Sequence, residues 1–354
     1  MKRTLIGFCI VVIMLVAWTG LAERQTERFT FSDGGTSGSS TVQHKLIPEA
    51  EAFSKIVSAD KRMEVHFLNV GQGDCILILC PNGKRILVDG GSSTKKFDPS
   101  PAKDYLVKQL GSQSRIDALV ITHPDKDHYN ILPDILEDID IGHIYLTGKP
   151  NEYRVANVNQ WLREFPASDR TILTAKKFNT KSPKKLGDFG EAQVVVLAAN
   201  VDGTGSYSET NTRSIVLKVS FGTIDILLAG DATLDTEADI LERVALSALD
   251  VECLKVGHHG SRTSTGVDWV KAVKPEVAVV LAGEKIYGHP THETIQRLEP
   301  FTATADPHRF VYYEKKGSDP DEFTDYAEAI YATSKSGNIV AVTEGKAIDI
   351  TYDN

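Results

Sequence analysis

The apolar positions of the chain fall into short runs that turn residues separate. The segments 64–70 (EVHFLNV), 75–80 (CILILC) and 85–89 (RILVD) are rich in branched side chains, and the turn Pro81-Asn82-Gly83 joins the second segment to the third. Runs of this length and composition predict strands in a hairpin-like succession.

Beyond residue 100, strand-like runs alternate with segments of helical periodicity. Strands are predicted at 116–122, 143–146, 192–197, 214–220, 223–229, 251–256, 277–281, 327–333, 338–342 and 347–351. Helices are predicted at 102–110, 131–137, 155–165, 233–246 and 267–273. Two strand-rich blocks, each followed by helices, predict an α/β fold in which two sheets pack together with helices outside them.

The N-terminus has the pattern of an export signal. Lys2 and Arg3 precede an apolar run over residues 5–18 and a small-residue stretch that ends at Ala22. The run is shorter than the roughly 20 residues of a membrane span. We therefore expect residues 1–22 to be a signal peptide, with an uncleaved N-terminal anchor as the alternative. The protein is expected to be exported, to the periplasm or the exterior, with no membrane contact beyond that anchor.

The next segment, residues 23–62, is expected to be a flexible linker and lead-in. Its first half is polar and contains the stretch SDGGTSGSS, a composition that does not build a core. The folded domain is expected to occupy residues 63–354.

Composition and charge narrow the choice of partners. The chain is 41% hydrophobic and 25% charged, which is ordinary for a globular protein. Its net charge of −9 opposes a wide nucleic-acid groove but leaves room for a small phosphoester held by metal ions. Cys75 and Cys80 are expected on one strand, roughly 16 Å apart at about 3.3 Å per residue, so we predict buried thiols rather than a disulfide.

The strongest chemical signal is the segment HPDKDH at residues 123–128, directly after the predicted strand 116–122. A strand that ends in a tight polar loop can aim several side chains at one point. Two of the loop's residues are histidines and two are aspartates, and such nitrogen and oxygen ligands suit divalent transition metals. The segment predicts a metal site, with a solvated acidic loop as the alternative.

Three later motifs repeat the pattern of apolar strand, turn and ligand-type side chain. Asp231 ends the run LLAGD, where it could bridge two cations or cap a helix. His258 and His259 follow a strand in VGHHGS, and as neighbours they can point to different sides. His289 lies in the turn YGHP. The repetition predicts that these side chains converge on a single cleft.

These motifs resemble the metallo-β-lactamase superfamily, and more closely the branch that contains the extracellular domain of ComEC-type DNA-uptake proteins. The resemblance runs from about residue 63 to the C-terminus. It is carried by HFLNVGQGDCILI, ILVDGG, ITHPDKDH, NTRSIVL, ILLAGD, LKVGHHGS, YGHP and the tail IYATSKSGNIVAVTEGKAIDI. It implies an αββα sandwich with a metal cleft at the sheet edges.

The resemblance also implies roles for individual residues. The implied metal ligands are His123, Asp125, Asp127, His128, Asp231 and one residue of the adjacent pair, taken as His258. From the chemistry of metal-assisted hydrolysis we assign catalytic roles to Asp127, His289 and the non-ligand member of the pair, taken as His259. The predicted substrate-binding residues are Asn211, Ser214, Ser261, Lys184 and Lys185. Asp125 stands where the superfamily's first motif has a second histidine, and Asn211 and Ser214 lie near where many members have a further one.

The resemblance and the ligand types together define the expected chemistry. We expect one or two divalent ions, with Zn²⁺ favoured and Mn²⁺ as a competitor because an extra carboxylate hardens the site. Zn²⁺ lowers the pKa of its bound water to about 7, which predicts a metal-bound hydroxide as nucleophile.

The leading hypothesis is a phosphodiesterase or nuclease-like hydrolase, with single-stranded nucleic acid as the foremost phosphodiester substrate. The lysine-rich run 176–185 is then a phosphate-attracting arm, with a solvated surface loop as the alternative. One alternative function is hydrolysis of a lactone, lactam, ester or cell-wall phosphoester. Another, from a different class, is a non-catalytic binding module with a degenerate metal site.

Overall fold

The structure is a computed structural model that describes residues 24–30, 41–44, 62–206, 208–284, 287–303, 308–316 and 319–353. The predicted signal peptide, residues 1–22, lies outside these residues. Within the described ranges no helix combines the length and the apolar character needed to cross a bilayer.

The larger sheet is formed by both ends of the described chain together with the strands that precede residue 173. Its order is β2 (Thr41–His44), β1 (Arg24–Thr30), β19 (Ala347–Asp353), β18 (Ile339–Thr343), β3 (Met63–Phe67), β4 (Ile76–Leu79), β5 (Arg85–Val88), β6 (Arg115–Ile121), β7 (Asp140–Leu146) and β8 (Arg170–Ile172). Strands β5, β6, β7 and β8 pair with one another in parallel. From β5 back to β2, each strand pairs with its neighbour in antiparallel fashion.

The second sheet comes from the later half of the chain. Its order is β17 (Ile330–Ala332), β14 (Val277–Val280), β13 (Cys253–Lys255), β12 (Ile224–Leu228), β11 (Val216–Phe221), β10 (Gln193–Ala198) and β9 (Lys184–Lys185). A separate hairpin, which the apolar pattern did not predict, consists of β15 (His308–Lys316) and β16 (Asp319–Ala327).

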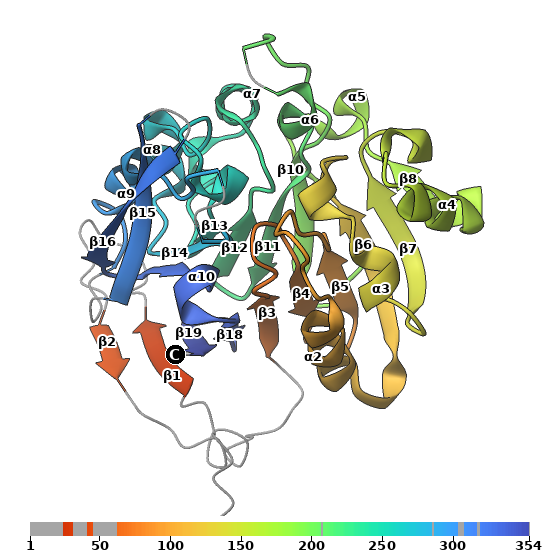
Figure 1. The fold of residues 1–354 in the computed structure, drawn as a ribbon, viewed down its shortest axis with the longest axis horizontal. Helices are drawn as coiled ribbons and strands as arrows, with labels where there is room; N and C mark the ends of the chain where they lie inside the picture. The colour runs from red at the N-terminus through yellow and green to blue at the C-terminus, as the bar shows by residue number, and fades with distance from the viewer. Residues whose placement is uncertain are drawn as a thin grey trace, which may run out of the picture.

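The helices lie outside the two sheets, as Figure 1 shows. The α-helices are α2 (Ser100–Leu110), α3 (Leu132–Ile135), α4 (Ala156–Glu164), α5 (Ala175–Phe178), α6 (Glu209–Thr212), α7 (Leu234–Arg243), α8 (Val267–Val273), α9 (His292–Leu298) and α10 (Thr333–Ser336). Short 3₁₀ turns are η1 (Gly111–Gln113), η2 (Lys126–His128), η3 (Pro150–Glu152), η4 (Ala167–Asp169), η5 (Leu246–Ala248) and η6 (Gly257–Gly260).

Three apolar clusters account for this layering. One cluster lies between the sheets and takes inward-facing residues of both, such as Val65 and Ile226. A second packs α7, α8 and α9 on the later sheet, with Trp269 buried in it. A third packs α2, α3 and α4 on the larger sheet, around Leu106. The αββα sandwich expected from the sequence is confirmed.

The lead-in was predicted wrongly in part, because it contributes two strands, β1 and β2, to the larger sheet. β1 pairs along its whole length with β19, and β2 pairs with β1 (Figure 1). The alternation within β1 explains this pairing: Phe29 is fully buried in the core between the sheets, while the exposed Arg28 pairs with Asp349 at 2.7 Å. A single buried aromatic within a polar segment is too weak a signal to oppose a linker-like composition.

The cysteine prediction is confirmed for the described residues. Cys75, Cys80 and Cys253 are buried free thiols. Burial raises the pKa of Cys80 to about 12, so its thiol stays protonated.

Parallel strands place the chemistry at one edge of each sheet. Chain segments that leave β5 and β6 carry Asp89 and His123, and those that leave β12 and β13 carry Asp231 and the histidine pair. The two edges meet, because Ile215 N donates a hydrogen bond of 3.0 Å to Thr122 O. Side chains from both sheets therefore reach one place.

Candidate metal centre

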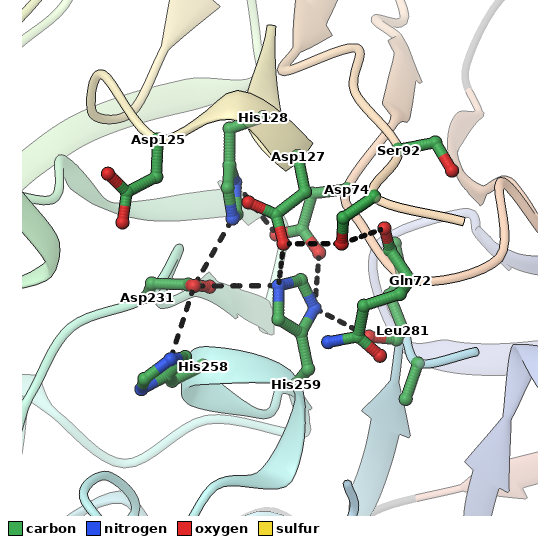
Figure 2. Close-up of polar contacts among 12 residues, drawn as sticks. Gln72, Asp74, Ser92, Asp125, Asp127, His128, Asp231, His258, His259 and Leu281 are labelled. Atoms are coloured by element: carbon green, nitrogen blue, oxygen red, sulfur yellow. Dashed lines mark hydrogen bonds and ion pairs between the residues drawn. The ribbon is translucent and has the colours of Figure 1, made fainter. Parts of the chain in front are cut away.

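The centre is organised around the carboxylate of Asp231, which follows β12. Its Oδ2 lies 3.2 Å from His128 Nε2, 3.4 Å from His259 Nε2, 3.8 Å from His258 Nε2 and 3.9 Å from His123 Nε2. Figure 2 shows Asp231 between the rings of His128, His258 and His259. A carboxylate that faces several imidazole nitrogens can form ion pairs with them or bind the same cations as they do.

The polar atoms that face the centre fit divalent metal ions. The Nε2 atoms of His123, His128 and His259 and Oδ1 of Asp231 are buried without a hydrogen-bond partner. Buried polar atoms normally have partners, so a group of unsatisfied atoms aimed at one point indicates a ligand. Among the described residues, three sets can each offer ligand atoms within 4.8 Å of one another: His123, His128 and Asp231; Asp127, His128 and His259; and Asp74, Asp89 and His128.

Hydrogen bonds on the far side of two rings orient them for this task. His128 Nδ1 donates to Asp89 Oδ2 at 2.8 Å, and His259 Nδ1 donates to the carbonyl of Leu281 at 2.7 Å. Both contacts use Nδ1 and leave Nε2 of each ring facing the centre. This is the usual support of a metal-binding histidine, in which an outer carboxylate or carbonyl fixes the tautomer and the ring.

Charges around the centre set the protonation of its groups. Burial alone would raise the pKa of Asp231, but the imidazoles of His128 and His259 hold it well below its usual value. Burial alone would lower the pKa of His128, but Asp231 and Asp89 raise it well above the ordinary range. For His123, burial lowers the pKa strongly. Asp231 is therefore ionised, and its charge attracts cations.

The histidine pair lies on a strained turn after β13. His258 and His259 have φ values of 47° and 53°, a left-handed conformation that is uncommon for residues with a Cβ. Two such residues in succession persist only where the surroundings hold them, which is frequent at functional sites. The turn directs the two rings to different places: His259 is buried beside Asp127, while the side chain of His258 is 22% exposed.

The positions of the His258 and His259 rings bear on which of the two is a metal ligand and which a catalytic group. His259, rather than His258, belongs to the set with Asp127 and His128. His258 Nε2 lies 3.1 Å from Asn211 Nδ2 and faces the other side of Asp231. The distances thus favour His259 as a ligand, whereas the sequence-based choice was His258 as ligand and His259 as catalytic group. The sequence alone cannot tell which of two adjacent histidines is the ligand, because the geometry of the turn decides where each ring points.

The two aspartates of the first motif differ in their surroundings. Asp127 Oδ2 lies 3.8 Å from His259 Nε2 and accepts a hydrogen bond of 3.2 Å from Ser93 Oγ. Asp125 Oδ2 lies 3.9 Å from His123 Nε2, and its side chain is 38% exposed. Partial burial raises the pKa of Asp125. Both aspartates face the centre, Asp127 from inside and Asp125 from its rim.

The predicted substrate contacts fall in different environments. Ser214 is fully buried, where its Oγ accepts a hydrogen bond of 3.1 Å from Asp231 N and lies 3.3 Å from His123 Nδ1. A positioning role therefore suits Ser214 better than the predicted substrate contact. Ser261 and His289 line a groove beside the centre, and the His289 ring lies 5.5 Å from that of His258.

The predicted lysine arm lies apart from the centre. Lys184 and Lys185 are exposed on the edge strand β9, which β10 and β11 separate from β12. Three strand spacings of about 4.8 Å place them roughly 14 Å to the side of the metal ligands. Their contact with a substrate stays a prediction.

A buried ion pair beneath the centre was not foreseen from the sequence. Lys255 Nζ lies 2.6 Å from Asp74 Oδ2, donates to Gly230 O at 2.8 Å and lies 3.8 Å from Asp231 Oδ1. Asp74 Oδ1 in turn lies 3.4 Å from His259 Nδ1. The motifs GQGD, DGG and LKVGHHGS contain Asp74, Asp89 and Lys255. The sequence signal that could have found the two aspartates is a carboxylate directly before or after an apolar strand.

Comparisons with known proteins agree with the fold and the centre. The family model of the metallo-beta-lactamase superfamily matches residues 68–284, which is more than half of the chain. The protein therefore belongs to the metallo-β-lactamase superfamily. The fold of this superfamily binds divalent metals and generally serves hydrolases, and the His/Asp centre lies within the matched residues.

Three relatives narrow the resemblance to competence proteins. ComE operon protein 3 of Bacillus subtilis (strain 168) is 26% identical over 67% of this chain and 30% of its own. Recombination protein 2 of Haemophilus influenzae is 29% identical over 69% and 27%, and competence protein ComA of Neisseria gonorrhoeae is 26% identical over 74% and 32%. The chain thus spans about a third or less of the length of these relatives. This agrees with the ComEC-type branch expected from the sequence.

Among solved structures, CmlA, a diiron β-hydroxylase from Streptomyces venezuelae, is similar with a TM-score of 0.42 and 15% identity. The similarity covers 68% of this chain and 51% of CmlA.

Proposed function

We propose that the protein is an exported metal-dependent phosphodiesterase with nuclease-like activity on single-stranded nucleic acid. The observation that carries the proposal is the set of buried, unsatisfied Nε2 atoms of His123, His128 and His259 around the Asp231 carboxylate. Two of the relatives support nucleic acid as the polymer, because their names refer to recombination and to competence. Export is supported by the predicted signal peptide.

Two divalent cations would find ligands in this centre. One would be held by Asp127, His128 and His259, and the other by His123, Asp125 and Asp231, with His258 beside it. A divalent cation bound there would activate a water molecule and polarise the scissile phosphoryl group. Zn²⁺ suits the imidazole nitrogens, and the carboxylates make Mn²⁺ its competitor.

The chain's own groups would orient the reactants and move protons. The Asp127 side chain is 18% exposed and faces the centre, where its Oδ2 can accept a proton from the attacking water. Ser93 Oγ, at 3.2 Å, holds this carboxylate in place. His289 lines the adjoining groove and can donate a proton to the leaving oxygen.

The proposal is tested by hydrolysis of bis-p-nitrophenyl phosphate and of single-stranded DNA. Asp127→Ala should lower both rates by about 10²–10⁴-fold, the usual effect of losing a positioned acid–base group. Asp134→Ala, at an exposed position on the neighbouring helix α3, is the matched control and should keep full activity. Equal rates for wild type and Asp127→Ala would overturn the proposal.

Assays of the same protein on other substrates distinguish the alternative functions expected from the family. Metal-dependent hydrolysis of a lactone, lactam, ester or cell-wall phosphoester, with no cleavage of either phosphodiester, would replace the nuclease-like function. Metal binding without hydrolysis of any of these substrates would indicate a non-catalytic binding module. In both cases the metal centre itself would stand.

A further inference from the structure

A groove of about 370 Å³ opens beside the metal centre. It is lined by the segment after η6, by the turn before α9 and by α9 itself, including Ser261, Arg262, Tyr287, His289 and Gln296. The ring of His289 lies 5.5 Å from that of His258, which faces Asp231. The groove therefore adjoins the centre on the side of His258, and its volume is within the range of ligand sites, about 300–1,000 Å³.

Tyr287 presents an aromatic face at the outer end of this groove. Its side chain is 68% exposed, the highest value among the large hydrophobic residues that the structure describes. Its φ of 58° is unusual for a bulky residue and costs free energy, so an exposed ring in this position calls for a function. The Tyr287 ring lies 6.2 Å from that of His289, and rings thus follow one another from the surface towards the centre.

Arg262 gives the same groove a cationic group. It is exposed, and among the described residues no carboxylate forms an ion pair with it. The acidic residue of the groove, Glu293, is paired with Arg297 at 2.8 Å, so its charge is compensated. An uncommitted guanidinium is suited to phosphate, which it can bind through two parallel hydrogen bonds.

We propose that this groove binds the nucleotide next to the scissile phosphodiester of a single-stranded nucleic acid. Tyr287 stacks on its unpaired base, and Arg262 contacts its phosphate. The proposal rests on the phosphodiesterase function proposed above and adds a recognition site to it. Every base has a π-face, so the site tolerates different sequences, whereas a duplex offers no free base to stack.

The base contact is tested by binding rather than by cleavage. The metal-loaded full chain is titrated with a fluorescent oligothymidylate whose phosphorothioate linkages resist hydrolysis, and with an abasic strand of the same length and charge. Tyr287→Ala should weaken oligothymidylate binding by about 5- to 150-fold, since stacking contributes about 1–3 kcal/mol per base. It should change abasic binding by less than about two-fold, and Tyr287→Phe should retain the preference. Leu246→Ala, which also removes an exposed hydrophobic side chain, is the control.

The phosphate contact is tested by the salt dependence of the same binding. Arg262→Ala should lower the slope of log K against log salt by roughly 0.7, the contribution of one phosphate of a single strand. Lys108→Ala removes an exposed cation from α2 and should leave the slope unchanged.

The outcomes separate this inference from the proposed function. Equal loss of oligothymidylate and abasic binding in Tyr287→Ala, or no loss of either, overturns the base site. An unchanged salt slope in Arg262→Ala overturns the phosphate contact. Binding as expected without cleavage of an ordinary strand supports the groove and overturns the nuclease-like function. Binding of a duplex as tight as that of a single strand overturns the stacking.

Discussion

Lys255 Nζ and Asp74 Oδ2 lie 2.6 Å apart beneath the metal centre, and both side chains are almost completely buried. Lys255 also lies 3.8 Å from Asp231 Oδ1, and Asp74 lies 3.4 Å from His259 Nδ1. The pair therefore lies next to one carboxylate and one imidazole of the centre. Lys255 compensates part of the negative charge that several carboxylates concentrate there.

Breaking this pair should cost much more than replacing it. Lys255→Met leaves Asp74 as a buried, unpaired charge and should lower the free energy of unfolding by about 3–5 kcal/mol. In the double variant Lys255→Met/Asp74→Leu, both charges are gone, and most of that loss should be recovered. Urea unfolding of the wild type and both variants measures this. Equal losses in the single and the double variant would contradict a paired charge.

Gly91 should be required for the position of the first motif. A Cβ at this residue would lie 2.3 Å from Asp127 C and 2.4 Å from His128 N, so Gly91→Ala must displace the backbone of two ligand residues. We expect metal affinity to fall by about 10–100-fold, as when groups that orient ligands are lost. Gly83→Ala is the control: its φ is +79°, but no atom lies within 4 Å, so it should cost about 1 kcal/mol of stability and no affinity. Metal titration of the two variants measures these affinities. Equal metal affinities of Gly91→Ala and Gly83→Ala would contradict the steric argument.

Stability should fall as pH rises, because of Glu237. Burial raises the pKa of this residue from 4.5 to about 8, although its carboxyl group accepts hydrogen bonds from Thr265 N and Gly266 N. The folded state therefore binds the proton more tightly than the unfolded state. Above the unfolded pKa of 4.5 stability declines, and the decline ends near the folded pKa of about 8.

The Glu237 contribution can be isolated with one variant. Glu237→Gln should remove the decline between about pH 7 and pH 8, while Glu252 and Glu276, whose pKa burial raises to about 7, still act below that range. Thermal unfolding across this range measures the effect, with Glu242→Gln at an exposed position of the same helix as control. A pH profile that Glu237→Gln leaves unaltered would exclude this assignment.

Phe29 tests whether the lead-in belongs to the domain. Its side chain is fully buried between the sheets, so Phe29→Ala should lower the free energy of unfolding by about 3–5 kcal/mol. Arg28→Ala loses only an exposed ion pair and should cost less than about 1 kcal/mol. Chemical unfolding compares the two, and a Phe29→Ala variant as stable as the wild type would show that β1 is dispensable.

Most of the fold was predictable because its strands and helices have clear apolar periods. The helix over Val267–Val273 has the predicted bounds, and both sheets contain the predicted strands. The polar strand β1 and the two-residue β9 were missed because pairing with neighbouring strands, rather than their own composition, forms them. Helix α9 was missed because its seven residues bury only one face, with Ile295 and Leu298.

The convergence of the strand-end residues was predictable, since parallel strands end at a common edge. The supporting groups were not: Asp74, Asp89 and Lys255 resemble ordinary charged residues near strand ends until their partners are known. The separate places of His258 and His259 depend on two left-handed residues, which no periodicity indicates.

The most direct test of the account is the metal content of Asp231→Asn. Elemental analysis of the purified wild type should find one or two divalent ions per chain, Zn²⁺ or Mn²⁺, as the ligand types favour. Asp231→Asn removes the charge that faces all four histidines of the centre and should lose at least one ion, whereas Asp225→Asn, on the strand β12 that precedes Asp231, should keep them all. A wild type without metal, or an Asp231→Asn variant with undiminished metal, would contradict the account.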